Sequence, residues 1–251
     1  MMNAALRVGG FAFVGFVVLI LTSANSLDDV TRSALAVFAA GLAANLAMVS
    51  KFERSRFADF GLGRPPRHLA AGIVLGAGAL GAVVFGAVAA GLATFVPATA
   101  DHSLYPLLVL LIMGAFGEEM LFRGYAFQYL LRVWNPPLVI LGSGLLFGAV
   151  HLANANVQPI AILNTVLWGC LLGYAYTRSG NLWLGGGIHA GWNVALTLCT
   201  SNLSGTTIVA TAWDLKWSAG EWWSGGSYGL EGGLLATVAA LPVFLLLRRV
   251  R

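Results

Sequence analysis

Long apolar runs constrain this 251-residue chain more than any other feature. A helix that crosses the hydrocarbon core of a bilayer needs about 20 predominantly apolar residues. The sequence therefore predicts an all-α, polytopic membrane protein, a bundle of about eight transmembrane helices, with seven or nine as alternatives. The predicted segments lie near residues 8–27, 30–50, 69–96, 104–132, 137–156, 158–178, 182–200 and 229–247.

The composition supports the same class of protein. Hydrophobic residues make up 58% of the chain and charged residues only 10%, against about 25% charged in soluble domains. A formal net charge of +4 gives no reason to expect a nucleic-acid partner in such a chain, and the expected environment is the lipid bilayer. The first run could also be a signal peptide, but we favour a retained helix.

The positions of the basic residues predict the orientation. Lys and Arg accumulate on the cytoplasmic side of short loops. If the N-terminus is cytoplasmic, twelve of the 14 basic residues fall on that side and only Arg32 and Lys216 fall outside. The sequence thus predicts cytoplasmic N- and C-termini. The cytoplasmic set is Arg7, Lys51, Arg54, Arg56, Arg64, Arg67, Arg123, Arg132, Arg178, Arg248, Arg249 and Arg251.

Other residues predict packing or anchoring rather than chemistry. Gly72 and Gly76 form a GxxxG pair, which favours close helix packing. Cys170 and Cys199 lie in apolar segments and are expected to fill space. Tryptophan prefers the headgroup level of a membrane, so the Trp-rich connection 201–228, with Trp213, Trp217, Trp222 and Trp223, is expected outside the membrane as an interfacial anchor.

Ionisable side chains inside spanning helices are costly and usually functional. Glu119 and Arg123 are spaced for a same-face helical pair, which could be purely structural. Glu118 points about 100° away, and burial would raise the pKa of such a carboxyl, as expected for a general base or acid. The ionisable residues in the apolar interior of the fourth to seventh segments are Glu118, Glu119, Arg123, His151 and His189, and Asn193 lies one turn beyond the last of them.

The two histidines are ambiguous when each is taken alone. His151 shares a helical face with Phe147, and His189 shares one with Asn193, yet either histidine could be a satisfied core residue. At about 1.5 Å per residue, Glu118 and His151 would lie roughly 20 Å from the cytoplasmic ends of their segments and His189 about 10 Å. We expect a shared cavity that opens toward the cytoplasm.

Three ordered motifs resemble one family: "EEMLFR" (118–123), "FGAVH" (147–151) and "HAGWN" (189–193). They resemble the EExxxR, FxxxH and HxxxN motifs of the CAAX protease and bacteriocin-processing intramembrane proteases, which include the type II CAAX prenyl endopeptidases. The resemblance covers roughly residues 104–200. It implies that Glu118 activates a water with His151, that Glu119 and Arg123 position the site, and that His189 and Asn193 stabilise the oxyanion.

The apolar segments and the motifs together predict three regions. Residues 1–103 would form N-terminal transmembrane helices with a basic cytoplasmic loop, residues 104–200 a catalytic core, and residues 201–251 the external Trp-rich loop and the last helix. The expected activity is an intramembrane endopeptidase in a bacterial inner membrane, accessible from the cytoplasm, with a membrane-associated protein or peptide as substrate.

Three questions stay open at the level of sequence. No cofactor is expected to be required, although a divalent metal such as zinc is an alternative, because one Glu and two His could supply three ligands. The rival functions are a proton-coupled membrane transporter, since intramembrane acids and histidines also form proton relays, and a non-catalytic scaffold or bacteriocin immunity protein. The physiological substrate is not encoded in any motif.

Overall fold

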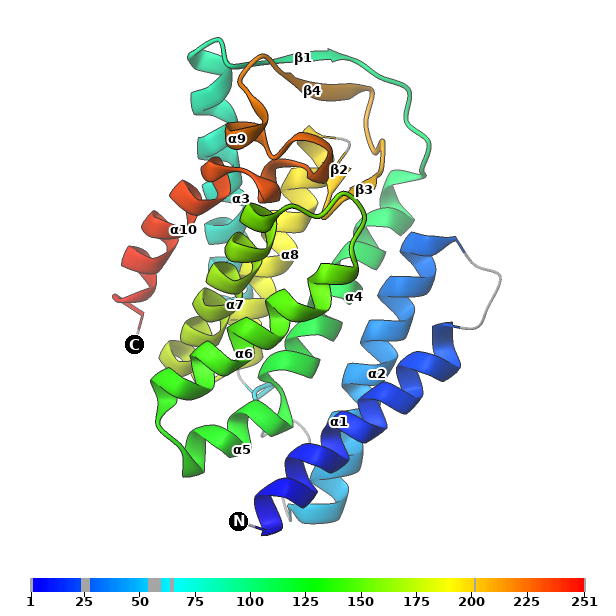
Figure 1. Cartoon of the computed structure of the whole chain (residues 1–251), viewed down its shortest axis with the longest axis vertical. Coiled ribbons are helices and arrows are strands. Elements are labelled where there is room, and N and C mark those ends of the chain that lie inside the picture. The colour runs from blue at the N-terminus through cyan, green and yellow to red at the C-terminus, as the bar shows by residue number, and fades with distance from the viewer. Residues whose placement is uncertain (1, 24–27, 54–59, 64–65, 201, 251) are drawn as a thin grey trace.

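A bundle of long helices dominates the computed structural model (Figure 1), which describes residues 2–23, 28–53, 60–63, 66–200 and 202–250. Each predicted segment coincides with a helix over most of its length, which confirms the mostly helical prediction. The long helices are α1 (Met2–Ser23), α2 (Asp29–Phe52), α3 (Pro66–Ala89), α4 (Leu104–Arg123), α5 (Tyr125–Val133), α6 (Pro136–Val150), α7 (Pro159–Ser179), α8 (Leu182–Cys199) and α10 (Leu234–Leu247).

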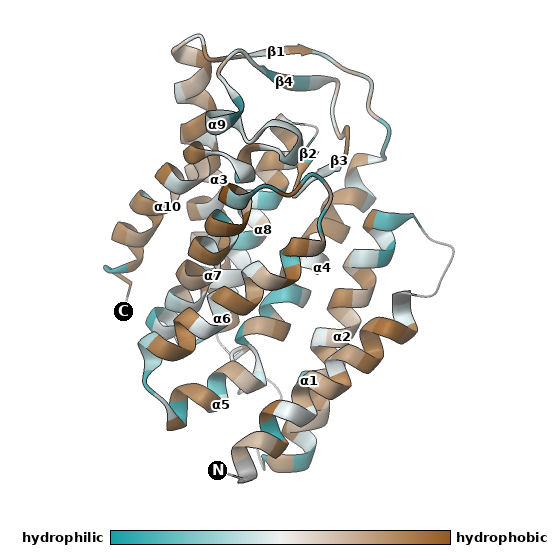
Figure 2. Cartoon of the chain, viewed as in Figure 1, coloured by the Kyte–Doolittle hydropathy of each residue, from teal (hydrophilic) through white to brown (hydrophobic). Residues whose placement is uncertain are grey.

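Six helices in the described part of the chain are long and apolar enough to cross a membrane, and α10 is a shorter apolar helix. Hydrophobic residues predominate along the long helices (Figure 2), and many large apolar side chains are exposed; Phe13 and Phe85, for example, are 68% and 76% exposed. A soluble protein would bury such residues, whereas lipid solvates them. The chain is therefore a polytopic membrane protein.

Helix α8 is not among the six, and its position explains why. It contacts α3, α4 and α7, and most of its side chains are buried. A helix enclosed by other helices does not need an apolar face toward lipid, so it can carry polar residues such as His189 and Asn193.

The contact between α3 and α8 confirms the predicted glycine packing. A Cβ atom at Gly72 would collide with the carbonyl oxygen of Leu184, and one at Gly76 with that of Ile188. Only hydrogen fits at these two positions, because the two backbones touch directly. This contact fixes α8 in the bundle one residue before His189.

The predicted segment 104–132 is broken at Gly124 into α4 and α5. Asn45, buried in α2, satisfies the break: its Nδ2 donates to the carbonyl of Met120 at 2.9 Å, and its Oδ1 accepts from the amide of Tyr125 at 2.7 Å. Backbone groups freed at a helix break need such partners inside a membrane. Asn45 therefore supports the end of the helix that carries both glutamates.

The connections depart from the all-α prediction. The predicted third segment ends early, at Ala89, and β1 (Ala93–Pro97) pairs antiparallel with β4 (Trp213–Trp217). A second pair joins β2 (Asn202–Leu203) to β3 (Thr206–Thr207), and the short helix α9 (Glu221–Ser224) follows. These elements gather at the end of the bundle opposite the N-terminus (Figure 1). Length explains the miss, because strands of two to five residues have no clear hydrophobic period.

Candidate active site

Glu119 and Arg123 form the predicted same-face pair of α4. Arg123 NH1 donates to Glu119 Oε1 at 2.9 Å, and both side chains are almost fully buried. Arg123 also donates from NH2 to the carbonyl of Gly169 in α7 at 2.7 Å, and its guanidinium lies 4.8 Å from the centre of the Phe147 ring. The pair thus ties α4 to α7 and α6.

Glu118 points away from that pair, as its position on the helix requires. Its Oε2 is buried and has no hydrogen-bond partner among the described residues, while 28% of its side chain remains accessible. A buried carboxylate oxygen without a partner costs free energy, and such exceptions mark functional groups or bound water. Glu118 is the acid that the fold leaves uncommitted.

His189 lies between the two glutamates. Its Nδ1 is 3.4 Å from Glu119 Oε1, and its Nε2 is 3.7 Å from Glu118 Oε2. The second distance exceeds hydrogen-bond length, so the Nε2 position stays free for another partner. Asn193 lies one turn further along α8. The helix begins at Asn181, whose side chain caps the amides of Trp183 and Leu184 at 3.1 and 3.3 Å.

His151 lies at the end of α6 rather than inside a helix. Its Nδ1 is 2.7 Å from the carbonyl oxygen of Phe147. A carbonyl only accepts, so Nδ1 carries a proton in this contact, and Nε2 is the ring nitrogen left for another partner. The resemblance pairs His151 with Glu118, but the histidine whose ring nitrogen lies 3.7 Å from the Glu118 carboxylate is His189. His151 and Glu118 instead line one cavity.

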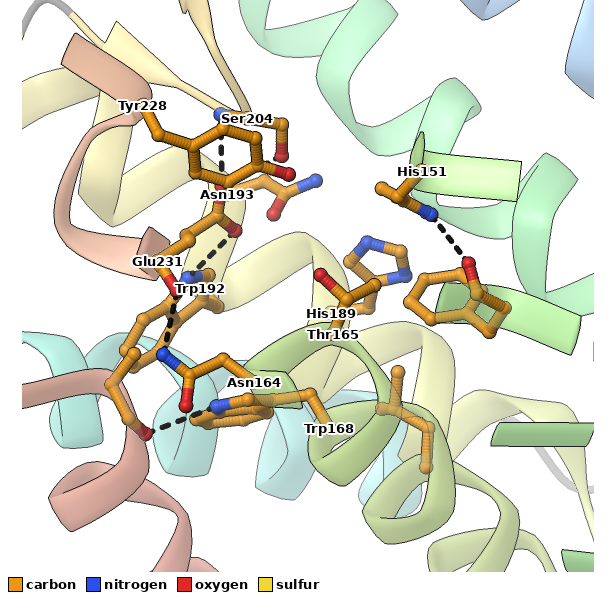
Figure 3. Close-up of a pocket in the computed structure, with 13 residues that line it drawn as sticks. His151, Asn164, Thr165, Trp168, His189, Trp192, Asn193, Ser204, Tyr228 and Glu231 are labelled. Atoms are coloured by element: carbon orange, nitrogen blue, oxygen red, sulfur yellow. Dashed lines mark hydrogen bonds between the residues drawn. The ribbon is translucent and has the colours of Figure 1, made fainter. Parts of the chain in front are cut away.

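Two cavities meet at these residues. The outer cavity, of about 390 Å³, is lined by Glu118, His151, His189 and Asn193 together with parts of α2, α4 and β2–β3. The inner cavity, of about 50 Å³, lies behind the histidines and is lined by polar and aromatic residues of α7, α8 and the connection to α10 (Figure 3). His151, His189 and Asn193 border both. The structure thus brings the three motifs together around one space.

The outer cavity does not open where the sequence predicts. Its exposed lining residues, which include Asp29, Ser33 and Thr206, lie at the end of the bundle opposite the N-terminus. The cavity therefore does not reach the surface at the basic end of the bundle, where the sequence predicts its opening. Helix α6 stops at Val150, so His151 lies at the end of that helix farther from the basic end.

Glu231 also borders the site, and sequence reasoning missed it. Its carboxylate accepts from the amide and hydroxyl of Ser204 at 2.9 and 2.6 Å and from Trp192 Nε1 at 3.2 Å. It lines the inner cavity with Tyr228, whose pKa burial raises to about 12. Glu231 is the one acidic residue in the predicted segment 229–247, and this position is the sequence feature that marks it. The predicted site drew only on the fourth to seventh segments.

The described residues contain no group of three His, Cys, Asp or Glu side chains that could hold a metal ion. His189 already faces a carboxylate with each ring nitrogen, and His151 has committed Nδ1 to a backbone carbonyl. In the described part of the chain, Glu118, His151 and His189 are therefore not grouped as a three-ligand site, and the expectation that no metal is required stays a prediction.

A polytopic helix bundle with an uncommitted carboxylate, two histidines and a cavity defines a membrane protein with an enzyme-like site. Residues 100–195 match the family described as type II CAAX prenyl endopeptidase Rce1-like. This stretch is a domain of that family, which is a family of proteases acting on proteins or peptides. A comparison with curated proteins found no match. The matched residues contain all three motifs.

Proposed function

We propose that this protein is an intramembrane endopeptidase that hydrolyses a peptide bond with an activated water, without a covalent enzyme intermediate. The single observation that carries the proposal is that Oε2 of Glu118, which has no hydrogen-bond partner among the described residues, lines the same cavity as His151, His189 and Asn193. The family match of residues 100–195 supports the reaction class. The bundle would cross a bacterial plasma membrane eight times, with both termini in the cytoplasm.

In this proposal Glu118 acts as the general base. A water in the outer cavity donates to the Glu118 carboxylate, while Nε2 of His151 accepts from the same water and orients it. The water oxygen attacks the carbonyl carbon of the scissile bond as its proton passes to Glu118. When the carbon–nitrogen bond breaks, Glu118 returns that proton to the leaving amine. General acid–base assistance of this kind contributes about 10²- to 10⁴-fold to a rate.

His189 and Asn193 would stabilise the negative oxygen of the tetrahedral intermediate. Nδ1 of His189 donates to Glu119, so in this proposal the ring is an imidazolium that carries a second proton on Nε2. Nε2 lies 3.7 Å from Glu118 without a hydrogen bond, which leaves that proton for an oxyanion, and Asn193 offers an amide proton from the next turn. Donors aimed at developing charge in a site that excludes bulk water are worth several kcal/mol. Glu119 and Arg123 act as positioning residues, because Glu119 holds Nδ1 of His189 at 3.4 Å.

The test is Glu118→Gln, which keeps the shape of the side chain and removes the base. We expect proteolysis to fall by about 10²- to 10⁴-fold with an unchanged unfolding temperature. New protein termini in the membrane proteome of cells that express the wild-type protein should disappear with the variant. Glu221→Gln, an exposed acid on α9, is the matched control and should cleave normally. Wild-type cleavage by Glu118→Gln would show the assignment to be wrong.

A further inference from the structure

The two ends of the bundle differ sharply in charge. At the end that holds the N-terminus, Arg7 and Arg132 both pair with Glu53 at 2.6 and 3.6 Å, and Arg178 donates to the carbonyls of residues 248 and 250. The helix termini that carry Lys51, Arg67, Arg248 and Arg249 are at this basic end as well. At the opposite end, Arg32 and Lys216 are each paired with an aspartate, and Asp28 and Asp101 add negative charge.

The lining of the outer cavity runs from Glu118 away from the basic end. On α4 the lining residues are Glu118, Ala115 and Leu111, which follow one another toward the start of the helix. On α2 the lining runs from Val37 through Ser33 to Asp29, the first residue of that helix. The exposed Asp29, Ser33 and Thr206 surround the mouth. From Glu118 to the level of Leu104, α4 rises by about 21 Å at 1.5 Å per residue.

Tight packing closes the floor of the cavity toward the basic end. A Cβ at Gly41 would lie 2.7 Å from the carbonyl oxygen of Gly117, and a Cβ at Gly117 would lie 2.6 Å from the amide of Phe38. Helices α2 and α4 therefore touch backbone to backbone beside Glu118, at the residue that precedes it. One turn further, Asn45 bonds Met120, so α2 and α4 leave no passage between them on that side.

We infer that the active site opens on the extracytoplasmic side of the membrane and takes as substrate an extracytoplasmic segment of a membrane-anchored protein. The basic end of a membrane protein faces the cytoplasm, and the cavity mouth is at the other end. This inference rests on the proposed peptidase function for the substrate, but the direction of the opening rests on the charges and the cavity alone.

The walls indicate what such a segment would look like. Leu110, Leu111, Val37 and Ile208 give the cavity apolar walls, whereas Asp29, Asn154 and Thr206 lie at or near the mouth. A volume of about 390 Å³ lies within the roughly 300–1,000 Å³ of ordinary ligand sites. An extended stretch with small or apolar residues at the scissile bond and polar residues beyond it, as found where a chain leaves the outer leaflet, matches this gradient.

Cysteine labelling tests the direction of the opening without any need for catalysis. In a Cys170→Ala, Cys199→Ala background, Ser33→Cys and Thr206→Cys place thiols on the cavity wall and mouth, and Lys51→Cys places one at the basic end. A membrane-impermeant maleimide added to spheroplasts should label the first two, and should label Lys51→Cys only after the membrane is permeabilised. Labelling of Lys51→Cys from outside, with the cavity positions protected, would overturn the inference.

Sided proteolysis tests the substrate class. Right-side-out and inverted membrane vesicles, with Glu118→Gln vesicles as the blank, are given a mixture of internally quenched peptides of random sequence that cannot cross the membrane. Glu118-dependent cleavage by right-side-out vesicles supports the inference, and cleavage by inverted vesicles alone overturns it. Cleavage by neither, with cavity thiols labelled from outside, would reject the peptidase and its substrate while supporting the direction of the opening.

Discussion

At the scale of single residues, two adjacent glutamates have opposite fates because neighbouring helical positions differ by about 100° in direction. Glu119 turns toward Arg123 and is neutralised in the core, at 2.9 Å. Glu118 turns toward the outer cavity, where its Oε2 finds no partner in the described part of the chain. One carboxylate therefore holds the site together, and the other is free for the reaction.

This division predicts different outcomes for two arginines. Arg123→Ala leaves Glu119 as an uncompensated buried charge, which costs about 3–5 kcal/mol, so the unfolding temperature in detergent should fall steeply. Arg132→Ala removes a half-exposed partner of Glu53 at 3.6 Å, worth about 0–1 kcal/mol, and should unfold close to the wild type. Equal unfolding temperatures for the two variants would contradict the structural role of Arg123.

At the scale of elements, α8 packs against α3 through direct contact between the two backbones rather than through interdigitating side chains. Gly72 and Gly76 of α3 and Gly187 and Gly191 of α8 face the opposing backbone, and the close approach fixes the height of His189 relative to α4. A buried helix can be placed this precisely because packed interiors leave no room for it to slide.

Alanine substitutions at two glycines of α3 test whether the α3–α8 contact itself, and not simply the presence of glycine in the helix, is needed. Gly76→Ala puts a methyl group against the carbonyl of Ile188, and overpacking costs about 1–3 kcal/mol, so we expect lower thermal stability and, because α8 shifts, lower proteolysis. Gly78→Ala meets nothing within 4 Å and should be neutral or slightly stabilising. Unfolding scans and cleavage assays of both variants check the prediction, which fails if Gly78→Ala is the more damaged.

At the scale of the whole molecule, the connection between α8 and α10 folds back over the site. Glu231 fastens it, since it accepts three hydrogen bonds from Ser204 and from Trp192, the residue before Asn193. Asn164 of α7 adds two bonds to the carbonyls of Glu231 and Gly233, both at 2.8 Å. Asn193, the proposed oxyanion donor, is therefore coupled to this connection through the neighbouring Trp192.

Loss of the Glu231 hydrogen bonds should destabilise the connection between α8 and α10. Glu231→Ala leaves the Trp192 and Ser204 donors without their acceptor, which costs about 1–3 kcal/mol for each group that stays buried. We expect faster hydrogen exchange in residues 202–233 and reduced proteolysis. Glu221→Ala, on the exposed α9 of the same connection, is the matched control. Identical exchange in the two variants would show that Glu231 does not hold the connection.

Much of this protein could be predicted from its sequence. Spanning helices are specified locally, by length and apolarity, so eight runs gave eight helical regions with errors at their ends. The spacing of Glu119 and Arg123 and the GxxxG pair of α3 are also local, and both contacts were correctly anticipated. The break at Gly124 was missed because the segment stays apolar across it, and only the position of Asn45 reveals it.

Only the tertiary structure decided which residues meet and where the cavity leads. The sequence by itself determined the membrane class, the three motifs and the charge difference between the ends, because each depends on residue types at short spacing. Where helices end and how closely they pack decide three features: the approach of His189 to Glu118, the position of Glu231 beside the site, and the direction in which the cavity opens. A shift of one turn moves a side chain by about 5.4 Å, and nothing local in the sequence fixes that.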